Sequence, residues 1–261
     1  MTAHRSSRFP SPRPVTVGAF LRELGRPFSF SGTPSRIALG VSLGLAVAVF
    51  LSTSFAPRAR AEGESPAAAV DVAAAGAAAS SPIPMIEAFH AGLLEIMKNA
   101  KTLGFQGRID ELEPLMAKTF DLDFMASKTV GRHWSTLTPA DQKRWAETFT
   151  RFTTANYAGR FTGFTGEEFV TVGVEEAAHD TRLVRTKIVV PNEEDVALDY
   201  RVIERDGSWK VIDVFLNGKV SELALRRSEY ASALKRDGFE QLVASVETKI
   251  ADLKSRGGSD G

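Results

Sequence analysis

The feature that most constrains the fold is a hydrophobic pattern that changes from helical spacing to alternation and back. Residues 182–190 and 196–202 alternate apolar and polar side chains, which is typical of strands with one buried face. Asp206-Gly207 follows the second of these runs and predicts a tight hairpin. With Phe169–Val174 and Trp209–Phe215, the pattern predicts about four strands paired as an antiparallel meander.

Helical spacing flanks these strands on both sides. Thr138-Pro139 is a helix start, because threonine can cap a helix and proline suits its first position. Gly131 is expected to end a short helix, and Pro114 to begin or bend another. Helical periodicity covers residues 86–103, 109–120, 122–130, 139–161, 223–238 and 242–253. The order predicts an α+β fold, in which helices wrap a curved antiparallel sheet around an apolar cavity.

The N-terminal region has the three parts of a secretory signal. Residues 37–51 are an uncharged apolar run of 15 residues. Ala59-Arg60-Ala61 follows it and matches the A-x-A pattern of a signal-peptide cleavage site. A basic leader precedes the run and contains Arg5, Arg8, Arg13, Arg22, Arg26 and Arg36. A helix that spans a bilayer needs about 20 apolar residues. We therefore expect a cleaved signal over residues 1–61 and a periplasmic protein, with an uncleaved anchor as the alternative.

The rest of the chain is expected to hold a single domain. Residues 62–81 are rich in Ala, Gly and Ser and contain too few large apolar side chains to form a core, which predicts a flexible linker. The folded α+β domain is expected over residues 82–255, and residues 256–261 as a disordered tail. We expect this domain to be a monomer.

Charge and composition exclude several classes of function. Acidic residues outnumber basic ones from Glu62 onward, which argues against a nucleic-acid partner. The chain contains no cysteine, which excludes thiolate metal sites and cysteine nucleophiles. His90, His133 and His179 are too scattered to match the ligand spacing of a metal site. No metal and no cofactor are expected.

Aromatic residues are more abundant than a small core needs. Several lie on one predicted helix, and others lie on the sheet, so that together they could wall an apolar pocket. Packing in the core is the alternative for each residue taken alone. The predicted lining consists of Trp145, Phe149, Phe152, Tyr157, Phe161, Phe164, Tyr200, Val202, Trp209, Val211 and Phe215.

One carboxylate is predicted to have a structural role. Asp213 lies between apolar residues in a strand, where a charge needs a partner, and Arg227 follows the turn at Gly218. We expect an Asp213–Arg227 pair to clamp the strand to the next helix. His133, Asp213 and Ser221 also supply the residue types of a hydrolytic triad, but the G-x-S-x-G elbow is absent. No catalytic residue is assigned.

Several ordered blocks of sequence resemble the MlaC family, also called toluene-tolerance proteins. The blocks are Phe120–Ala126, Gly131–Trp134, Leu137–Gln142, Phe149, Trp209–Val214, Asn217-Gly218, Ser221 and Arg227–Tyr230. The spacing between Gly218 and Ser221 is one residue longer than the family pattern. Residues 223–235 (LALRRSEYASALK) are most similar to the hopanoid-associated branch, HpnM.

The resemblance implies an NTF2-like curved sheet with a deep cavity for acyl chains and no catalysis. It also implies a periplasmic carrier that binds phospholipid and exchanges it with membrane-bound subunits of an ABC-type lipid transporter. A hopanoid, which is a polycyclic triterpenoid, is the alternative ligand. Two other classes stay open, namely an NTF2-like isomerase or dehydratase and an interaction module with a filled core. The enzyme needs an acid or base inside the sheet, where the predicted residues other than Thr186 and Asp213 are apolar.

Overall fold

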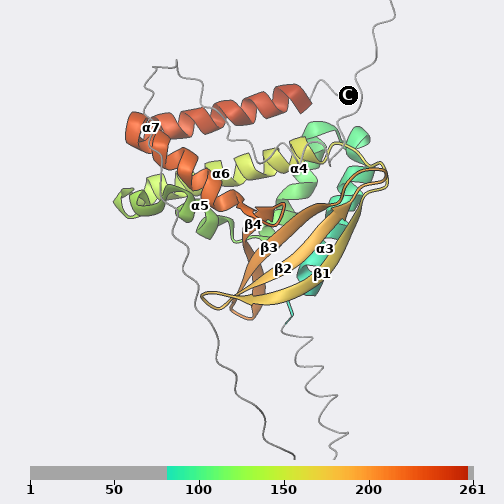
Figure 1. Ribbon diagram of the computed structural model, residues 1–261. Helices are drawn as coiled ribbons and strands as arrows, with labels where there is room; N and C mark the ends of the chain where they lie inside the picture. The colour runs from blue at the N-terminus through green and yellow to red at the C-terminus, as the bar shows by residue number, and fades with distance from the viewer. Residues whose placement is uncertain (1–80, 258–261) are drawn as a thin grey trace, which may run out of the picture. The chain divides into compact units, whose positions relative to one another are not determined.

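The structure, a computed structural model, describes residues 81–257 (Figure 1). The predicted leader 1–61 with its apolar run, the predicted linker up to residue 80, and residues 258–261 lie outside the described residues. Between residues 81 and 257, no helix is both long enough and apolar enough to cross a membrane. The elements are α3 (Ile83–Lys98), α4 (Ala100–Thr119), α5 (Leu122–Val130), the 3-10 helix η1 (Gly131–Thr136), α6 (Pro139–Arg160), β1 (Glu168–Ala177), β2 (Thr181–Val189), β3 (Val196–Arg205), β4 (Ser208–Leu216), β5 (Val220–Ser221) and α7 (Glu222–Gly257).

The strands form one antiparallel meander in the order β1-β2-β3-β4-β5. The predicted α+β class and the meander are therefore confirmed, and a fifth strand of two residues is added. Asp206 and Gly207 both have positive φ, at 49° and 72°, as the predicted hairpin turn requires. Figure 1 shows the sheet twisting as it runs away from the helical layer.

A bulge in β4 corrects one prediction about its faces. Tyr200 pairs with Val214, so regular pairing would bring Val202 opposite Ile212. Val202 pairs with Val211 instead. One extra residue in β4 therefore places Val211 and Val214 on the same face. Simple alternation along residues 209–215 predicts that Phe215 shares a face with Val211; this is wrong, because Phe215 pairs with Asp199 on the opposite face.

Helix α3 covers one face of the sheet and closes the main core there (Figure 1). The ring of Phe89 packs against Phe120 at 5.2 Å and against Tyr200 at 6.2 Å between centroids. Tyr157 of α6 completes the cluster at 6.0 Å from Phe120. All four rings are buried, so this part of the interior is a packed aromatic core.

A second core lies between α5, α6 and α7. The indole Nε1 of Trp145 donates to the carbonyl of Ala126 at 3.0 Å and to the hydroxyl of Thr129 at 3.2 Å. The ring of Trp145 meets Tyr230 of α7 edge to face at 5.1 Å. Burial of an aromatic side chain of this size stabilises a fold by roughly 3 kcal/mol or more.

Two of the predicted helix ends are found where the sequence places them. Thr138 caps α6 by accepting from the backbone N–H of Asp141 at 3.1 Å. Gly131, with φ of 56°, ends α5. Pro114 lies inside α4 instead of beginning a helix, and the break in that helix falls at Gly104. A similar break at Gly238 divides α7, which continues to Gly257, past the predicted start of the tail.

Candidate functional site

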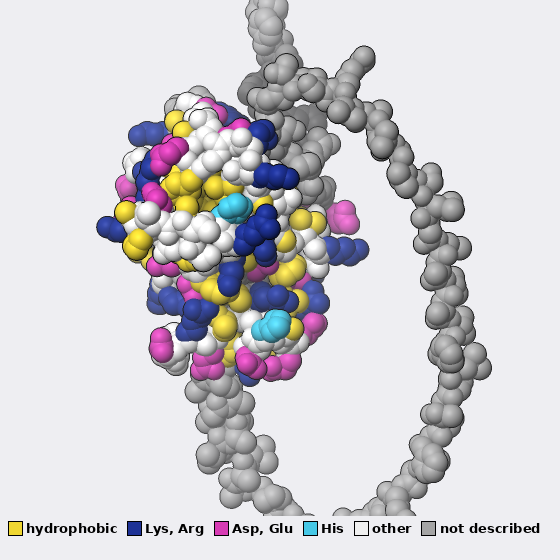
Figure 2. All heavy atoms as spheres, turned by 90° about the vertical axis from the view of Figure 1, so that its left-hand side faces the viewer, with side chains coloured by type: hydrophobic (Ala, Val, Ile, Leu, Met, Phe, Trp, Pro, Cys, Tyr) yellow, Lys and Arg dark blue, Asp and Glu magenta, His cyan; other side chains and the backbone are white. Residues whose placement is uncertain are grey.

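The candidate site is a pocket of about 860 Å³ on the sheet face opposite Tyr200 and Val202. Helix α5, the hairpin turn after β1 and the first turns of α7 form its other walls. Ligand pockets typically have volumes of about 300–1,000 Å³, and this pocket lies within that range. Figure 2 looks onto the side of the molecule that carries α5 and α7, where apolar side chains lie among Lys and Arg.

The floor of the pocket is apolar. Ile203 of β3 and Phe215 of β4 project from the outer face of the sheet, and the bulge residue Ile212 is buried beside them. Phe124 of α5 and Leu223 of α7 close the floor from two sides. The bulge is what allows β4 to offer both an inner apolar pair and an outer apolar side chain.

Cationic side chains surround this floor. Lys128 projects from α5, one turn after Phe124, and its Nζ lies 4.8 Å from the centroid of the Phe124 ring. Arg201 of β3 lies over Phe215 at 5.7 Å, and Arg227 of α7 lines the opposite wall. The combination of an apolar floor with cations at its edge suits an amphipathic molecule with a negative polar end.

The carboxylate of Asp213 is fixed inside the pocket wall. Its Oδ2 accepts a hydrogen bond from the hydroxyl of Ser221 at 2.6 Å, and its Oδ1 accepts from the backbone N–H groups of Val214 and Leu223 at 2.8 and 3.1 Å. Burial raises the pKa of Asp213, while these hydrogen bonds oppose that rise. Ser221 accepts in turn from Ala224 N–H at 2.9 Å. The two side chains together cap α7.

The structure differs from two sequence hypotheses about Asp213. No ion pair joins it to Arg227 within residues 81–257, although both line the pocket, so the predicted partner of Asp213 is wrong. The guanidinium of Arg227 lies instead against Gly131, where an added Cβ would be 3.1 Å from Nε. Ser221 donates directly to Asp213, whereas a hydrolytic triad needs a histidine between these two groups.

Gly218 shapes the approach to this site. It has φ of 66° and follows Asn217, whose φ is 51°, in the turn between β4 and β5. A Cβ at Gly218 would lie 3.4 Å from the buried carboxylate of Asp199. The turn therefore brings the chain back close to the sheet, where the hydroxyl of Ser221 can donate to Asp213.

The structure places the residues of the predicted aromatic lining in different environments. Among the described residues, Phe215 is the one member of the predicted set that lines this pocket. Phe164 is 41% exposed and lies near Lys98, and Trp209 is half-buried under Arg182. The remaining members are buried in the two cores, namely Trp145, Phe149, Phe152, Tyr157, Phe161, Tyr200, Val202 and Val211. Contact of these residues with a ligand stays a prediction.

Sequence reasoning missed most of the floor and rim. Phe124 and Lys128 are spaced by four residues, which places them on one face of α5. Arg201 and Ile203 alternate with the buried Tyr200 and Val202, so their shared outer face was readable from the sequence. The pairing of that face with α5 and α7 was not readable, because it depends on tertiary structure.

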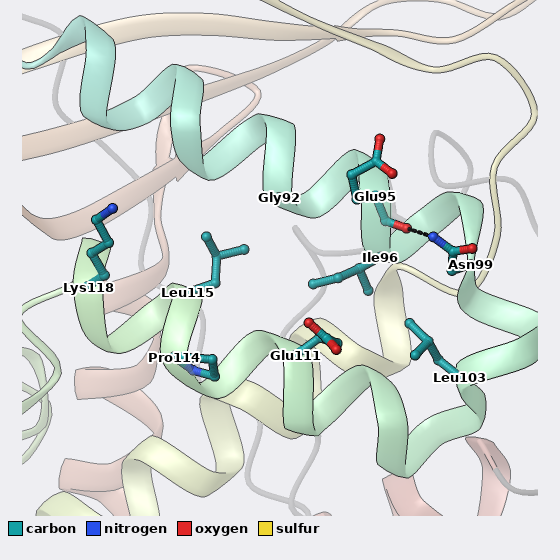
Figure 3. Close-up of a pocket in the computed structure, with 9 residues that line it drawn as sticks. All are labelled: Gly92, Glu95, Ile96, Asn99, Leu103, Glu111, Pro114, Leu115 and Lys118. Atoms are coloured by element: carbon teal, nitrogen blue, oxygen red, sulfur yellow. Dashed lines mark hydrogen bonds between the residues drawn. The ribbon is translucent and has the colours of Figure 1, made fainter.

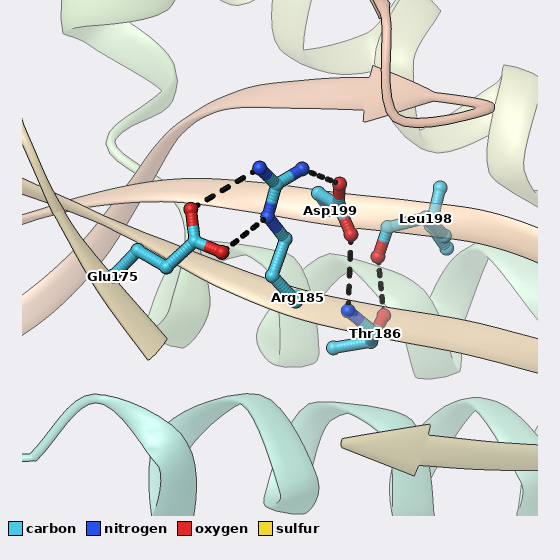
Figure 4. A network of polar contacts seen from close by, with 5 residues as sticks. All are labelled: Glu175, Arg185, Thr186, Leu198 and Asp199. Atoms are coloured by element: carbon cyan, nitrogen blue, oxygen red, sulfur yellow. Dashed lines mark hydrogen bonds and ion pairs between the residues drawn. The ribbon is translucent and has the colours of Figure 1, made fainter. Parts of the chain in front are cut away.

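Beside the pocket, a polar network covers the same sheet face (Figure 4). Arg185 donates to the buried Asp199 at 2.7 Å and to the exposed Glu175 at 3.1 Å. These hydrogen bonds raise the pKa of Arg185. Asp199 also accepts from the backbone N–H of Thr186 at 3.1 Å, so both oxygens of its carboxylate accept a hydrogen bond. We assign this network to stability of the sheet.

The other pockets are less suited to an amphipathic ligand. A groove of about 500 Å³ between α3 and α4 has Ile96, Leu103 and Leu115 beside the acidic Glu95 and Glu111 (Figure 3). A pocket of about 990 Å³ next to α6 is lined mainly by polar and charged residues. Across residues 81–257, no three acidic or histidine side chains are grouped to hold a metal ion.

Comparisons with known proteins agree with this fold. No match was found among curated proteins. A solved structure of a phospholipid-binding protein from Ralstonia solanacearum, in complex with a phospholipid, matches with a TM-score of 0.59 and 24% identity. The match covers 65% of this chain and 97% of that one, which shows a shared fold. The family model for MlaC protein matches residues 87–248, more than half of the sequence. The chain therefore belongs to the MlaC family.

Proposed function

We propose that this protein is a periplasmic carrier that binds the acyl chains of one membrane phospholipid. It then passes the lipid to, or receives it from, membrane-bound subunits of an ABC-type lipid transporter. The observation that carries this proposal is the 860 Å³ pocket, with its apolar floor and its cationic edge. Family membership and the phospholipid bound to the protein of the same fold from R. solanacearum support it.

The energetics of such a pocket favour a lipid. Removal of apolar surface from water contributes about 25 cal/mol per Å², so an acyl chain gains affinity without a specific polar contact. Export through a cleaved leader over residues 1–61 is part of the proposal, because a carrier between two membranes has to work outside the cytoplasm.

Binding rather than catalysis is proposed because the one carboxylate among the described residues of the pocket is already engaged. Asp213 accepts three hydrogen bonds and caps α7, so it is not placed to exchange a proton with a ligand. His179 is exposed on the turn after β1, and within residues 81–257 its side chain has no hydrogen bond or ion pair with Asp213.

Native mass spectrometry combined with lipid extraction tests the proposal. The protein is purified from its own envelope without detergent, and its bound molecules are identified. About one diacyl phospholipid per chain is expected. A triterpenoid at that ratio would assign the ligand to hopanoids, for which the HpnM-like residues 223–235 are the supporting observation. If no lipid co-purifies and added lipid is not taken up, the carrier function is rejected and an interaction module is favoured.

A further inference from the structure

We propose that Lys128, Arg201 and Arg227 form a phosphate subsite that selects lipids with an anionic head group. The inference rests on the proposed lipid binding in the 860 Å³ pocket and adds the chemical class of the polar end. The three cations come from three separate elements, α5, β3 and α7, and all of them line the same pocket.

The charge of the pocket is not balanced by its own acid. Asp213 is the one carboxylate among its lining residues, against Lys128, Arg201 and Arg227, and His179 adds a titratable group at the turn. The carboxylate of Asp213 is already held by Ser221 and by two backbone N–H groups. The pocket therefore keeps an excess of positive charge, which attracts an anion.

The pocket cations differ from neighbouring cations in their partners. Arg205 also lies over the Phe124 ring, at 4.8 Å, but it forms an ion pair with Asp121 at 3.2 Å. Within residues 81–257, no carboxylate forms an ion pair with Lys128 or Arg227, and the buried Nε of Arg201 has no hydrogen-bond partner. The exposed side chains of Lys128 and Arg227 therefore remain available for a ligand.

Depth separates the charges from the apolar floor. Lys128 and Arg227 are exposed, whereas Ile212 is buried and Ile203 and Phe215 are half-buried. An acyl chain on the floor would leave its glycerophosphate at the level of the two exposed cations. Arginine and lysine are the side chains that bind phosphate oxygens most strongly, through charge-assisted hydrogen bonds.

The test compares two lipids that share their acyl chains. The delipidated full chain is incubated with vesicles of equal parts phosphatidylglycerol and digalactosyl diacylglycerol, which has no phosphate, and bound lipid is quantified by mass spectrometry. Phosphatidylglycerol is expected to exceed the galactolipid on the order of tenfold, since one charge-assisted hydrogen bond contributes about that factor. The double variant Lys128→Gln and Arg227→Gln should lower this ratio to about one while total lipid per chain is retained.

Two further variants separate the local effect from net charge and from folding. Lys101→Gln with Lys254→Gln removes the same charge from exposed positions outside the pocket and should keep the preference. The exchange Lys128→Arg with Arg227→Lys should also keep it. An equal uptake of both lipids by the unmodified chain, or a preference that survives the double Gln variant, would overturn the subsite and leave lipid binding intact.

The remaining outcomes distinguish a lipid phosphate from free phosphate as the ligand. They also distinguish failure of the subsite from failure of the carrier function. Titration calorimetry with inorganic phosphate should show no stoichiometric binding, because the ion lacks the apolar contacts. Stoichiometric phosphate binding without any lipid uptake would assign the cations to free phosphate and overturn the lipid subsite. Uptake of neither lipid and no phosphate binding would reject both the subsite and the proposed function.

Discussion

The ring Nε2 of His90 lies 3.0 Å from the hydroxyl of Tyr200, in a hydrogen bond that joins α3 to β3 across 110 residues of sequence. The His90 ring also stacks on Phe169 of β1, with centroids 4.3 Å apart. His90 is 4% exposed, and burial lowers its pKa to about 3. The helix that covers the sheet is therefore fixed by a neutral histidine.

This histidine predicts a pH dependence of stability. Because the pKa of His90 is lower in the folded chain than its ordinary value of 6.5, the unfolded chain binds the proton first. Its contribution is complete above pH 6.5 and is lost as pH falls toward 3, at about 1.4 kcal/mol per pH unit. Urea unfolding of the wild type and of His90→Gln across this window measures the difference. Parallel pH profiles for the two chains would show that His90 is not the group responsible.

Asp213 is predicted to stabilise the fold through Ser221 and the start of α7, without Arg227. Asp213→Ala should lower the free energy of unfolding by about 2–4 kcal/mol, because a buried carboxylate that accepts three hydrogen bonds is lost. Arg227→Ala, at an exposed position, should change it by less than about 0.5 kcal/mol. Equal losses for the two variants in denaturant unfolding would restore the hypothesis of an Asp213–Arg227 clamp.

Gly238 is predicted to be required for the break in α7. Its φ of 83° and ψ of 177° are accessible to glycine and strained for other residues. Gly238→Ala should destabilise the fold by about 1–3 kcal/mol, through the backbone alone, since a Cβ there meets nothing within 4 Å. Gly163→Ala is the matched control, because a Cβ there also meets nothing and its φ is not in the left-handed region. A similar cost for both variants would contradict the explanation.

The two carboxylates that bind Arg185 should contribute unequally. The side chain of Asp199 is 4% exposed and that of Glu175 is 58% exposed, although both lie within 3.1 Å of the guanidinium. Asp199→Ala should cost about 3 kcal/mol or more, because it removes a buried partner of Arg185 and of the Thr186 N–H. Glu175→Ala should cost about 0.5 kcal/mol or less. Thermal or urea unfolding of both single variants decides this.

The elements predicted correctly are those set by local signals. The cap at Thr138, the end of α5 at Gly131 and the turn at Asp206-Gly207 each depend on a few adjacent residues, and all three are confirmed. The meander follows from the alternation of β2 and β3, because one-sided burial imposes a period of two.

The features that were missed depend on pairing between distant residues. The bulge opposite Arg201 and Val202 carries no signal in β4 itself, and without it Phe215 was placed on the wrong face. The partner of Asp213 was missed because Ser221 reaches it only after the turn at Gly218. The candidate pocket could not be predicted as a whole, because its walls come from α5, β3, β4 and α7.

Lipid uptake by a chain whose pocket has been filled tests the central claim most directly. Ala224 is an exposed residue of α7 that lines the 860 Å³ pocket, so Ala224→Trp should occupy the pocket without removing a core side chain. Ala146→Trp is the matched control, because Ala146 lines the separate polar pocket beside α6. We predict that phospholipid bound per chain, after incubation with vesicles, falls several-fold in Ala224→Trp and is unchanged in Ala146→Trp. Unchanged uptake by Ala224→Trp, with the fold retained, would contradict this pocket as the lipid site.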